Sequence, residues 1–200
     1  MIYAYLALGD SYTIGEQLLL SESFPYQTVQ LLRKKNFPFF APEIIAKTGW
    51  TTDELQIEID KTTFLKKYDF VSLLIGVNNQ YRGRSVEEYK VQFQQLLQKA
   101  ISLSGNNVQH VFVLSIPDWG VTAFAKERDT NKIAFEIDSY NDACKNITEN
   151  AGCNFLNITA QQRLDNIPKM IAEDGLHPSP FEYAKWAEKL ADAITLRCSF

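Results

Sequence analysis

Hydrophobic and polar positions along the chain follow two alternating periods. Short runs rich in β-branched and aromatic residues are separated by longer stretches in which apolar residues recur every three or four positions. The runs predict strands at Ile2–Leu8, Glu43–Ala46, Phe70–Ile75, Val108–Ser115 and Asn154–Leu156. The longer stretches predict helices near Pro25–Lys35, Thr52–Lys61, Val86–Ser104, Lys132–Asn150 and Pro180–Arg197. This alternation favours an α/β fold, a three-layer α/β/α sandwich with a central, mainly parallel five-stranded sheet.

Two of the predicted helices have well-marked starts. Ser85 and Ser179 are each followed, three positions later, by a glutamate, which is the spacing of a capping box. Pro180 at the first helical position strengthens the second start, so the last helix is expected to begin just after His177. The segment Ile116–Asn131 is the longest irregular stretch, and loops of that length are often functional.

Chain length and composition favour one compact unit. The chain has 200 residues, of which 46% are hydrophobic and 22% charged, so it can bury most of its apolar surface. We therefore predict a single domain over residues 1–200. The formal net charge is −4, and Lys and Arg are scattered rather than gathered into a stripe that could neutralise phosphates. Nucleic acid is not an expected partner.

The cysteines and the apolar segments indicate in which cellular compartment the protein is expected. Cys144, Cys153 and Cys198 include no Cys-x-x-Cys pair and cannot all pair within the chain, which favours a reducing compartment. The apolar start Ile2–Leu8 has no basic residue before it and is too short for the core of a signal peptide. No stretch approaches the roughly 18 apolar residues that span a bilayer. We predict a cytoplasmic protein without stable membrane insertion, with a removed secretory signal peptide as the alternative; the oligomeric state stays open.

Polar and reactive residues gather in four short segments near the predicted strand ends and before the last helix. The segments are Gly9–Tyr12, Lys47–Trp50, Gly76–Asn79 and Asp174–Pro178. Ligands bind at the carboxyl ends of the strands in an open parallel sheet, so these segments are expected to share one rim. Together they supply a hydroxyl, a glycine amide, a carboxamide, a carboxylate and an imidazole. Acyl transfer needs this set: a nucleophile, a base, a group that orients the base, and donors for the developing oxyanion.

Asp174 and His177 are the candidates for the orienting group and the base. They are three residues apart, so the carboxylate can lie close enough to accept a hydrogen bond from the ring and fix its tautomer. The chain has only two histidines, and the other, His110, falls in an apolar strand pattern and is interpreted as structural. Asp10 is interpreted as a brace that accepts backbone hydrogen bonds in the loop beside Ser11.

These segments resemble the SGNH (GDSL) hydrolase family, which is named for Ser, Gly, Asn and His in that chain order and begins with a Gly-Asp-Ser run. The matching residues are Ser11, Gly49, Asn78 and His177, and the resemblance covers nearly the whole chain. It implies a flavodoxin-like three-layer fold and a serine hydrolase. One departure is visible, because the family commonly has an aspartate where this chain has Asn79, and we expect that position to be structural.

The resemblance implies a role for each matching residue. Ser11 is the expected nucleophile, His177 the general base and Asp174 its orienting partner. The backbone amides of Ser11 and Gly49 and the side chain of Asn78 form the implied oxyanion hole. Four aromatic residues of the rim loops are candidates for an acyl or aryl pocket: Trp50, Tyr81, Trp119 and Phe124. No cofactor and no metal is implied.

Other functions fit the sequence less well. An aspartate-nucleophile phosphatase or kinase is expected to have a second acid two residues after Asp10, where Tyr12 stands. The Gly-rich motifs that bind nucleotide phosphates do not occur, and two distant histidines without a cysteine pair do not form a metal centre. A non-catalytic binding module on the same fold is the alternative from another class, although such a module would normally have lost one of the expected groups.

The expected activity is cleavage of a small-molecule carboxylic ester through an acyl-enzyme, as in a carboxylesterase or lysophospholipase. The residues do not distinguish this from a carbohydrate O-deacetylase or an acyl thioesterase, and the aromatic loops favour short-chain or aryl esters. Taken singly, each residue also has an ordinary explanation, because serine favours caps and turns while glycine and asparagine favour turns. Their coincidence at one rim is what indicates a site.

Overall fold

Five parallel strands form a single central sheet. The computed structural model describes residues 2–165 and 167–198. The strands are β1 (Tyr5–Asp10), β2 (Glu43–Lys47), β3 (Phe70–Leu74), β4 (Val111–Leu114) and β5 (Asn154–Leu156). They lie in the order β2-β1-β3-β4-β5, and every pairing between these neighbours is parallel. The predicted parallel sheet is confirmed, and its strand order is that of flavodoxin-like folds.

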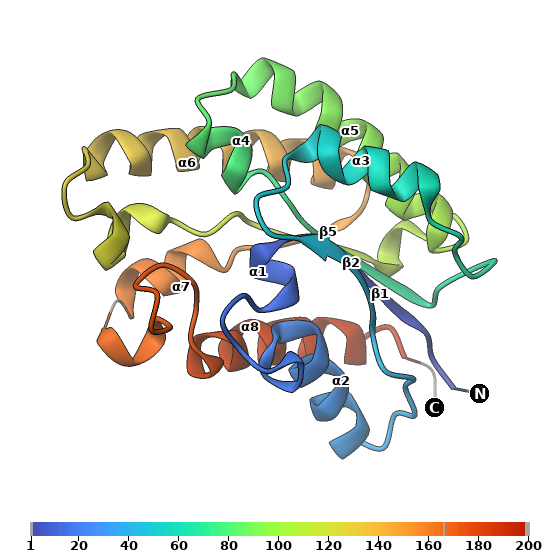
Figure 1. Ribbon diagram of the computed structural model, residues 1–200. Helices are drawn as coiled ribbons and strands as arrows, with labels where there is room; N and C mark the ends of the chain where they lie inside the picture. The colour runs from blue at the N-terminus through green and yellow to red at the C-terminus, as the bar shows by residue number, and fades with distance from the viewer. Residues whose placement is uncertain (1, 166, 199–200) are drawn as a thin grey trace.

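Helices cover both faces of this sheet. They are α1 (Ser11–Ile14), α2 (Phe24–Lys34), α3 (Thr52–Lys61), α4 (Val77–Tyr81), α5 (Val86–Leu103), α6 (Thr130–Asn150), α7 (Thr159–Leu164) and α8 (Pro180–Thr195). Short 3₁₀ turns occur at Leu20–Glu22, Val108–His110, Trp119–Val121, Ala123–Ala125 and Pro168–Met170. Figure 1 shows α3, α5 and α6 over one face and α2 and α8 over the other. The three-layer α/β/α sandwich is therefore confirmed.

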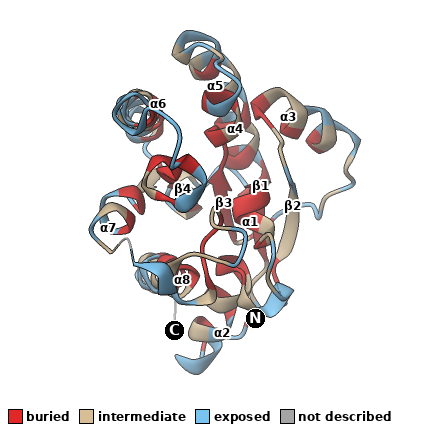
Figure 2. Ribbon diagram, turned by 60° about the vertical axis from the view of Figure 1, so that its left-hand side comes forward, coloured by how far each residue is buried: buried red, intermediate tan, exposed pale blue. Residues whose placement is uncertain are grey.

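The central strands are buried on both faces. Every residue of β1, β3 and β4 is buried, which explains why these strands appear in the sequence as continuous apolar runs rather than alternating ones. Figure 2 shows the same distribution, with buried strands inside and exposed outer faces on the helices. Two polar groups within this core are paired with each other: the Tyr5 and Ser72 hydroxyls lie 2.7 Å apart and share a hydrogen bond.

The element boundaries differ from the predicted ones where local polar contacts decide them. The first strand begins later than expected and continues through Asp10. The predicted strand Val108–Ser115 starts only at Val111, because the Asn107 side chain accepts from Gln109 N and turns the preceding residues into a 3₁₀ helix. The last helix begins at Pro180 as predicted, but the Ser179 capping interaction was wrong: its hydroxyl donates to the Lys169 carbonyl oxygen instead.

The strand order places a crevice beside β1. This strand lies between β2 and β3, so the crossover connections that leave β1 and β2 run in opposite directions along the sheet. Loops at the carboxyl ends of such strands diverge and leave a binding site at the switch point. The segments after β1, β2 and β3 are the ones in which the sequence places Ser11, Gly49 and Asn78.

Candidate active site

Ser11 lies at a tight turn between β1 and α1. It is the first residue of α1, and Asp10 caps this helix by accepting a hydrogen bond from Tyr12 N at 3.0 Å. A Cβ atom at Gly9 would lie 2.1 Å from Thr13 Oγ1 and 2.4 Å from the Leu74 carbonyl oxygen, so only glycine fits there. Because Ser11 begins a helix, its N–H has no intrahelical acceptor and is available to a ligand.

His177 and Asp174 reach Ser11 from the loop before α8. The Nε2 atom of His177 lies 3.0 Å from Ser11 Oγ, and its Nδ1 lies 2.5 Å from Asp174 Oδ2. The other carboxylate oxygen accepts from the backbone N–H groups of Leu176 and His177, both at 2.9 Å. The Tyr12 ring packs against the imidazole with 5.0 Å between centroids. The imidazole is therefore held on one side by a carboxylate and on its face by an aromatic ring.

The charge state of Asp174 follows from these contacts. Partial burial raises its pKa, but the hydrogen bonds from the His177 ring and from two backbone N–H groups favour the carboxylate and outweigh burial. The net result is a pKa below the ordinary aspartate value. The contacts around Asp174 thus favour its ionised form, which can accept a hydrogen bond from the His177 ring.

The loop after β2 is fastened to helix α4. Gly49 adopts φ = +83°, a left-handed conformation that favours glycine. Its carbonyl oxygen accepts from Arg82 Nη2 at 2.6 Å. The Asn78 carboxamide nitrogen donates to the Trp50 carbonyl oxygen at 3.0 Å and lies 3.4 Å from Asp10 Oδ2. The two ends of α4 therefore hold the turn that presents Gly49.

Asn79 is buried beside this turn and has a structural role, as expected. Its Oδ1 accepts from Thr52 N at 3.1 Å, and its Nδ2 donates to Thr52 Oγ1 at 2.7 Å. The Thr52 hydroxyl in turn donates to Gln92 Oε1. An aspartate at position 79 could accept from Thr52 N but could not donate to a hydroxyl whose own proton is already used. Asparagine therefore matches the neighbours that this chain has.

One cavity connects these groups. It has a volume of about 180 Å³, and Ser11, Gly49, Asn78 and His177 all line it. The remaining wall is largely apolar, with Tyr81, Trp119 and Phe124 among its residues. The three rings contact one another, with centroid separations of 5.3 Å, 6.2 Å and 6.0 Å. Apolar cavities with a few converging polar groups are typical of small-molecule sites.

Trp50 and His110 lie outside this cavity. The Trp50 side chain was expected in the pocket, but it is not part of the cavity lining and packs, partly buried, against the hydrophobic core. His110 Nδ1 lies 2.7 Å from the Asp69 carbonyl oxygen, and its ring stacks on Phe70 at 4.7 Å, as expected of a structural histidine. Among the described residues, no group of three or more His, Cys, Asp or Glu side chains is arranged to hold a metal ion.

Residues 7–185 match the GDSL-like lipase/acylhydrolase family. The chain belongs to this family. It is accordingly a hydrolase that acts on ester bonds. No curated protein is close enough in sequence to count as a match. Within residues 2–165 and 167–198, no helix is both long enough and apolar enough to cross a bilayer.

Solved structures share the fold of this GDSL hydrolase at low sequence identity. The structure of TesA is 15% identical, with a TM-score of 0.77 over 98% of this chain and 99% of the other. The psychrotrophic esterase EstA from Pseudoalteromonas sp. is 14% identical, with a TM-score of 0.75 and 98% of each chain covered. Axe2, an acetylxylan esterase from Geobacillus stearothermophilus, is 19% identical, with a TM-score of 0.76 over 96% and 94%.

Sequence reasoning missed two residues that shape the site of this GDSL hydrolase. Gln80 lies on α4 and hydrogen bonds the Trp119 indole, and Arg82 follows the same helix and holds Gly49. Arg82 lies four positions after Asn78, a spacing that places two residues on one face of a helix, so its position was a usable signal. Gln80 lies two positions after Asn78 and gave no such signal.

The buried Asp10 carboxyl generates a testable prediction for stability. Burial raises its pKa to about 7, despite hydrogen bonds from Tyr12 N and Asn78 that lower it. An ordinary aspartate ionises near pH 3.8, so between about pH 4 and pH 7 the folded protein holds a proton that the unfolded chain has lost. The free energy of unfolding that this group contributes therefore falls as pH rises through that window and levels off above it.

Asp10→Asn removes this titration while keeping an oxygen that can accept from Tyr12 N. Relative to wild type, the variant is expected to gain stability steadily from about pH 4 to pH 7, and the difference is expected to level off above that. Urea unfolding followed by circular dichroism at several pH values measures the difference, in which the other titrating groups cancel. A difference that stays constant with pH would show that Asp10 is ionised in the folded protein throughout.

Proposed function

We propose that this GDSL hydrolase cleaves carboxylic esters of small molecules through an acyl-enzyme formed on Ser11. The supporting observation is the line of contacts from Ser11 Oγ to His177 Nε2 at 3.0 Å and from His177 Nδ1 to Asp174 Oδ2 at 2.5 Å, with Ser11 opening into the cavity. A hydroxyl, an imidazole and an ionised carboxylate in this order form a nucleophile with its base and orienting group.

The reaction follows from the donors and acceptors at these atoms. His177 Nε2 removes the proton from Ser11 Oγ, and the oxygen attacks the ester carbonyl carbon to form a tetrahedral intermediate. His177 then gives the proton to the leaving alcohol oxygen as the C–O bond breaks, which leaves an acyl group on Ser11. A water molecule attacks the acyl group with His177 again as base, and the carboxylic acid leaves. Asp174 stabilises the imidazolium in both halves of the reaction.

The oxyanion hole in this proposal consists of the backbone N–H groups of Ser11 and Gly49 and the side chain of Asn78. All three residues line the cavity with Ser11. The Asn78 carboxamide donates one hydrogen to Trp50 O at 3.0 Å, which fixes its plane. Its other hydrogen faces Asp10 Oδ2 only at 3.4 Å, a weak contact that an oxyanion can replace. Donors fixed in this way act mainly on the charge that develops in the transition state.

The cavity supports short-chain or aryl esters as substrates. Its volume of about 180 Å³ and its three aromatic residues suit a small acyl or aryl group. A lysophospholipase-like activity, carbohydrate O-deacetylation and acyl thioester hydrolysis use the same chemistry on other leaving groups. The acetyl group is among the smallest acyl groups, so sugar acetates are the second candidate that the cavity size favours. A cytoplasmic location belongs to the same proposal, and the three cysteines Cys144, Cys153 and Cys198 are free.

Ser11→Ala tests the proposed function. We expect the variant to lose at least about 10³-fold in kcat on every substrate that the wild type hydrolyses, since it lacks the nucleophile. A panel of p-nitrophenyl esters of rising acyl length, an acetylated sugar and an acyl-CoA measures both activity and preference. Ser139→Ala is the matched control, because this serine is exposed on α6 and bonds only its own helix. Undiminished turnover in Ser11→Ala would contradict the assignment.

The pH dependence of activity tests the role of the His177–Asp174 pair. A general base must be unprotonated to accept the Ser11 proton, so kcat/KM is expected to fall on acidification. Asp174→Asn is expected to lower kcat by about 10²- to 10⁴-fold, because the amide can stabilise the wrong tautomer and cannot support the imidazolium. The measurement is kcat/KM for a neutral ester from pH 5 to 8, with folding followed by circular dichroism. A flat wild-type profile over this range in folded protein would rule out the pair as base.

A further inference from the structure

Trp119, Tyr81 and Phe124, three of the aromatic residues that line the cavity, lie at different depths. Trp119 is only 5% exposed, whereas Tyr81 is 47% and Phe124 45% exposed. All three line the cavity, and the two exposed rings contact the indole at 5.3 Å and 6.0 Å between centroids. Tyr81 and Phe124 therefore lie at the mouth, and Trp119 forms the inner wall.

The indole of Trp119 is held by a directed hydrogen-bond chain. Its Nε1 donates to Gln80 Oε1 at 2.7 Å, and Gln80 Nε2 donates to Glu136 Oε2 at 2.8 Å. A carboxamide has a distinct donor end and acceptor end, so its partners here permit only one orientation. Gln80 is buried, and moving the indole away would leave a donor and an acceptor unpaired inside the protein. The side chain of Trp119 is therefore fixed in place.

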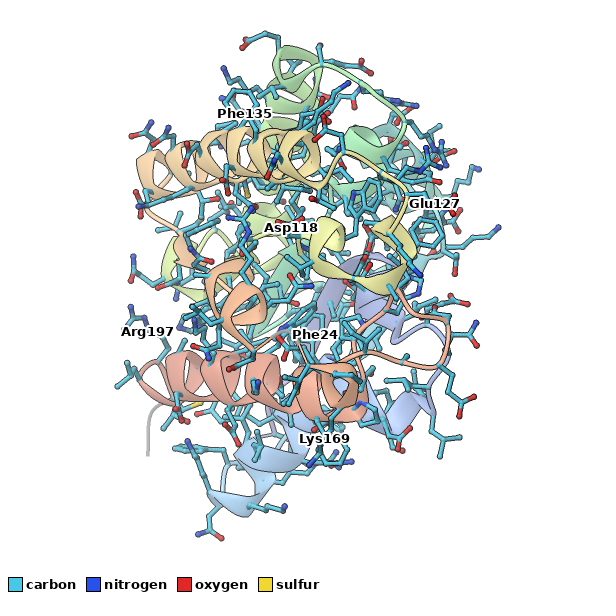
Figure 3. The ribbon with its side chains drawn as sticks, turned by 90° about the vertical axis from the view of Figure 1, so that its left-hand side faces the viewer. Phe24, Asp118, Glu127, Phe135, Lys169 and Arg197 are labelled. Atoms are coloured by element: carbon cyan, nitrogen blue, oxygen red, sulfur yellow. The ribbon has the colours of Figure 1, made fainter. Side chains whose placement is uncertain are left out.

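The backbone of Trp119 is fixed independently by Asp118. This buried carboxylate accepts from Gly120 N and from Arg163 Nε, each at 2.8 Å, and the Asp118 N–H donates to Gln162 Oε1 at 2.8 Å. Figure 3 shows Asp118 inside the molecule and Phe135 on the outer side of α6. The wall is therefore restrained at both its backbone and its ring.

From this arrangement we infer that Trp119 sets the upper limit on acyl-chain length and that Gln80 is the positioning residue that makes the limit sharp. The inference rests on the proposed function and specifies its substrate class as esters of short acyl chains. The acyl group of the Ser11 ester extends from the oxyanion donors into the cavity and meets the indole. A movable wall would yield to a longer chain, but this one cannot move without losing buried hydrogen bonds.

The test compares kcat/KM for p-nitrophenyl octanoate with that for p-nitrophenyl acetate, because the leaving group is the same in both. In wild type the ratio is expected to be far below one. Trp119→Ala is expected to raise it by at least about 10-fold, since even one substrate methylene in a hydrophobic pocket changes discrimination by roughly 10- to 200-fold. Gln80→Met keeps the side-chain length but not the hydrogen bonds, and is expected to raise the ratio several-fold. Phe135→Ala, 73% exposed on α6, is the control and is expected to leave the ratio unchanged.

Coupling between the two residues separates a positioning role from general loosening. Trp119→Phe lacks the indole N–H, so Gln80→Met added to it is expected to change the ratio no further, whereas Gln80→Met alone changes it several-fold. Trp119→Phe and Gln80→Met remove less of the side chain, so they still test the chain-length limit if Trp119→Ala does not fold. Additive effects of the two substitutions would remove Gln80 from the inference.

The failure of this inference is distinguishable from failure of the proposed function. If Ser11→Ala retains ester hydrolysis, the proposed function fails first. If hydrolysis depends on Ser11 but the wild type accepts octanoate as readily as acetate, only the chain-length limit is overturned. The same holds if all Trp119 and Gln80 variants keep the wild-type ratio.

Discussion

The contact between Ser11 Oγ and His177 Nε2 joins two residues 166 positions apart, and much of the architecture serves to make it possible. Ser11 is fixed by β1, whose buried residues place it at the switch point of the sheet. His177 is fixed from the other end of the chain, by the Asp174 carboxylate and by the start of α8. Neither segment could bring Ser11 and His177 together alone. The proposed reaction therefore depends on the parallel sheet, which fixes the position of Ser11.

A second set of contacts fastens the segment that carries the proposed oxyanion donor Gly49. Asn78, Asn79 and Arg82 each bond the segment between Gly49 and Thr52, so α4 and its C-terminal residue hold the loop after β2. The Asp10 carboxyl lies beside Asn78, and burial raises its pKa to about 7. Burial disfavours the charged form of this carboxyl and so reduces the negative charge near the position where the proposed oxyanion would develop.

The sequence predicted the parts of the fold that depend on burial. The strand predicted at Phe70–Ile75 and observed at Phe70–Leu74 was recognisable because a parallel strand buried on both faces is a continuous apolar run. Asn154–Leu156 was predicted with its observed limits, although this edge strand is only partly buried. Helix Thr52–Lys61 was predicted with its observed limits, whereas α1 and α4, with four and five residues, are too short to show a helical period. The family resemblance pointed to Ser11, Gly49, Asn78 and His177, which the structure places around one cavity. The distances between their side chains could be obtained only from the structure.

Side-chain direction could not be predicted from pattern. Trp50 follows a strand end like the other rim residues, yet its ring packs against the core and only its carbonyl oxygen contacts Asn78. Gln80 looks like an ordinary helix residue until the fold brings Trp119 and Glu136 to its two ends. Contacts between residues 39 and 56 positions apart depend on packing of the whole chain, which local sequence does not encode.

The central claim is that Ser11 is the nucleophile, and covalent trapping tests it most directly. A fluorophosphonate reacts with an activated serine and leaves a stable adduct whose position mass spectrometry of the digested protein identifies. We predict one adduct, on the peptide that contains Ser11, and a greatly slowed reaction in His177→Ala because the base that activates the hydroxyl is gone. An adduct on another serine, or labelling of Ser11 at the same rate without His177, would contradict the claim.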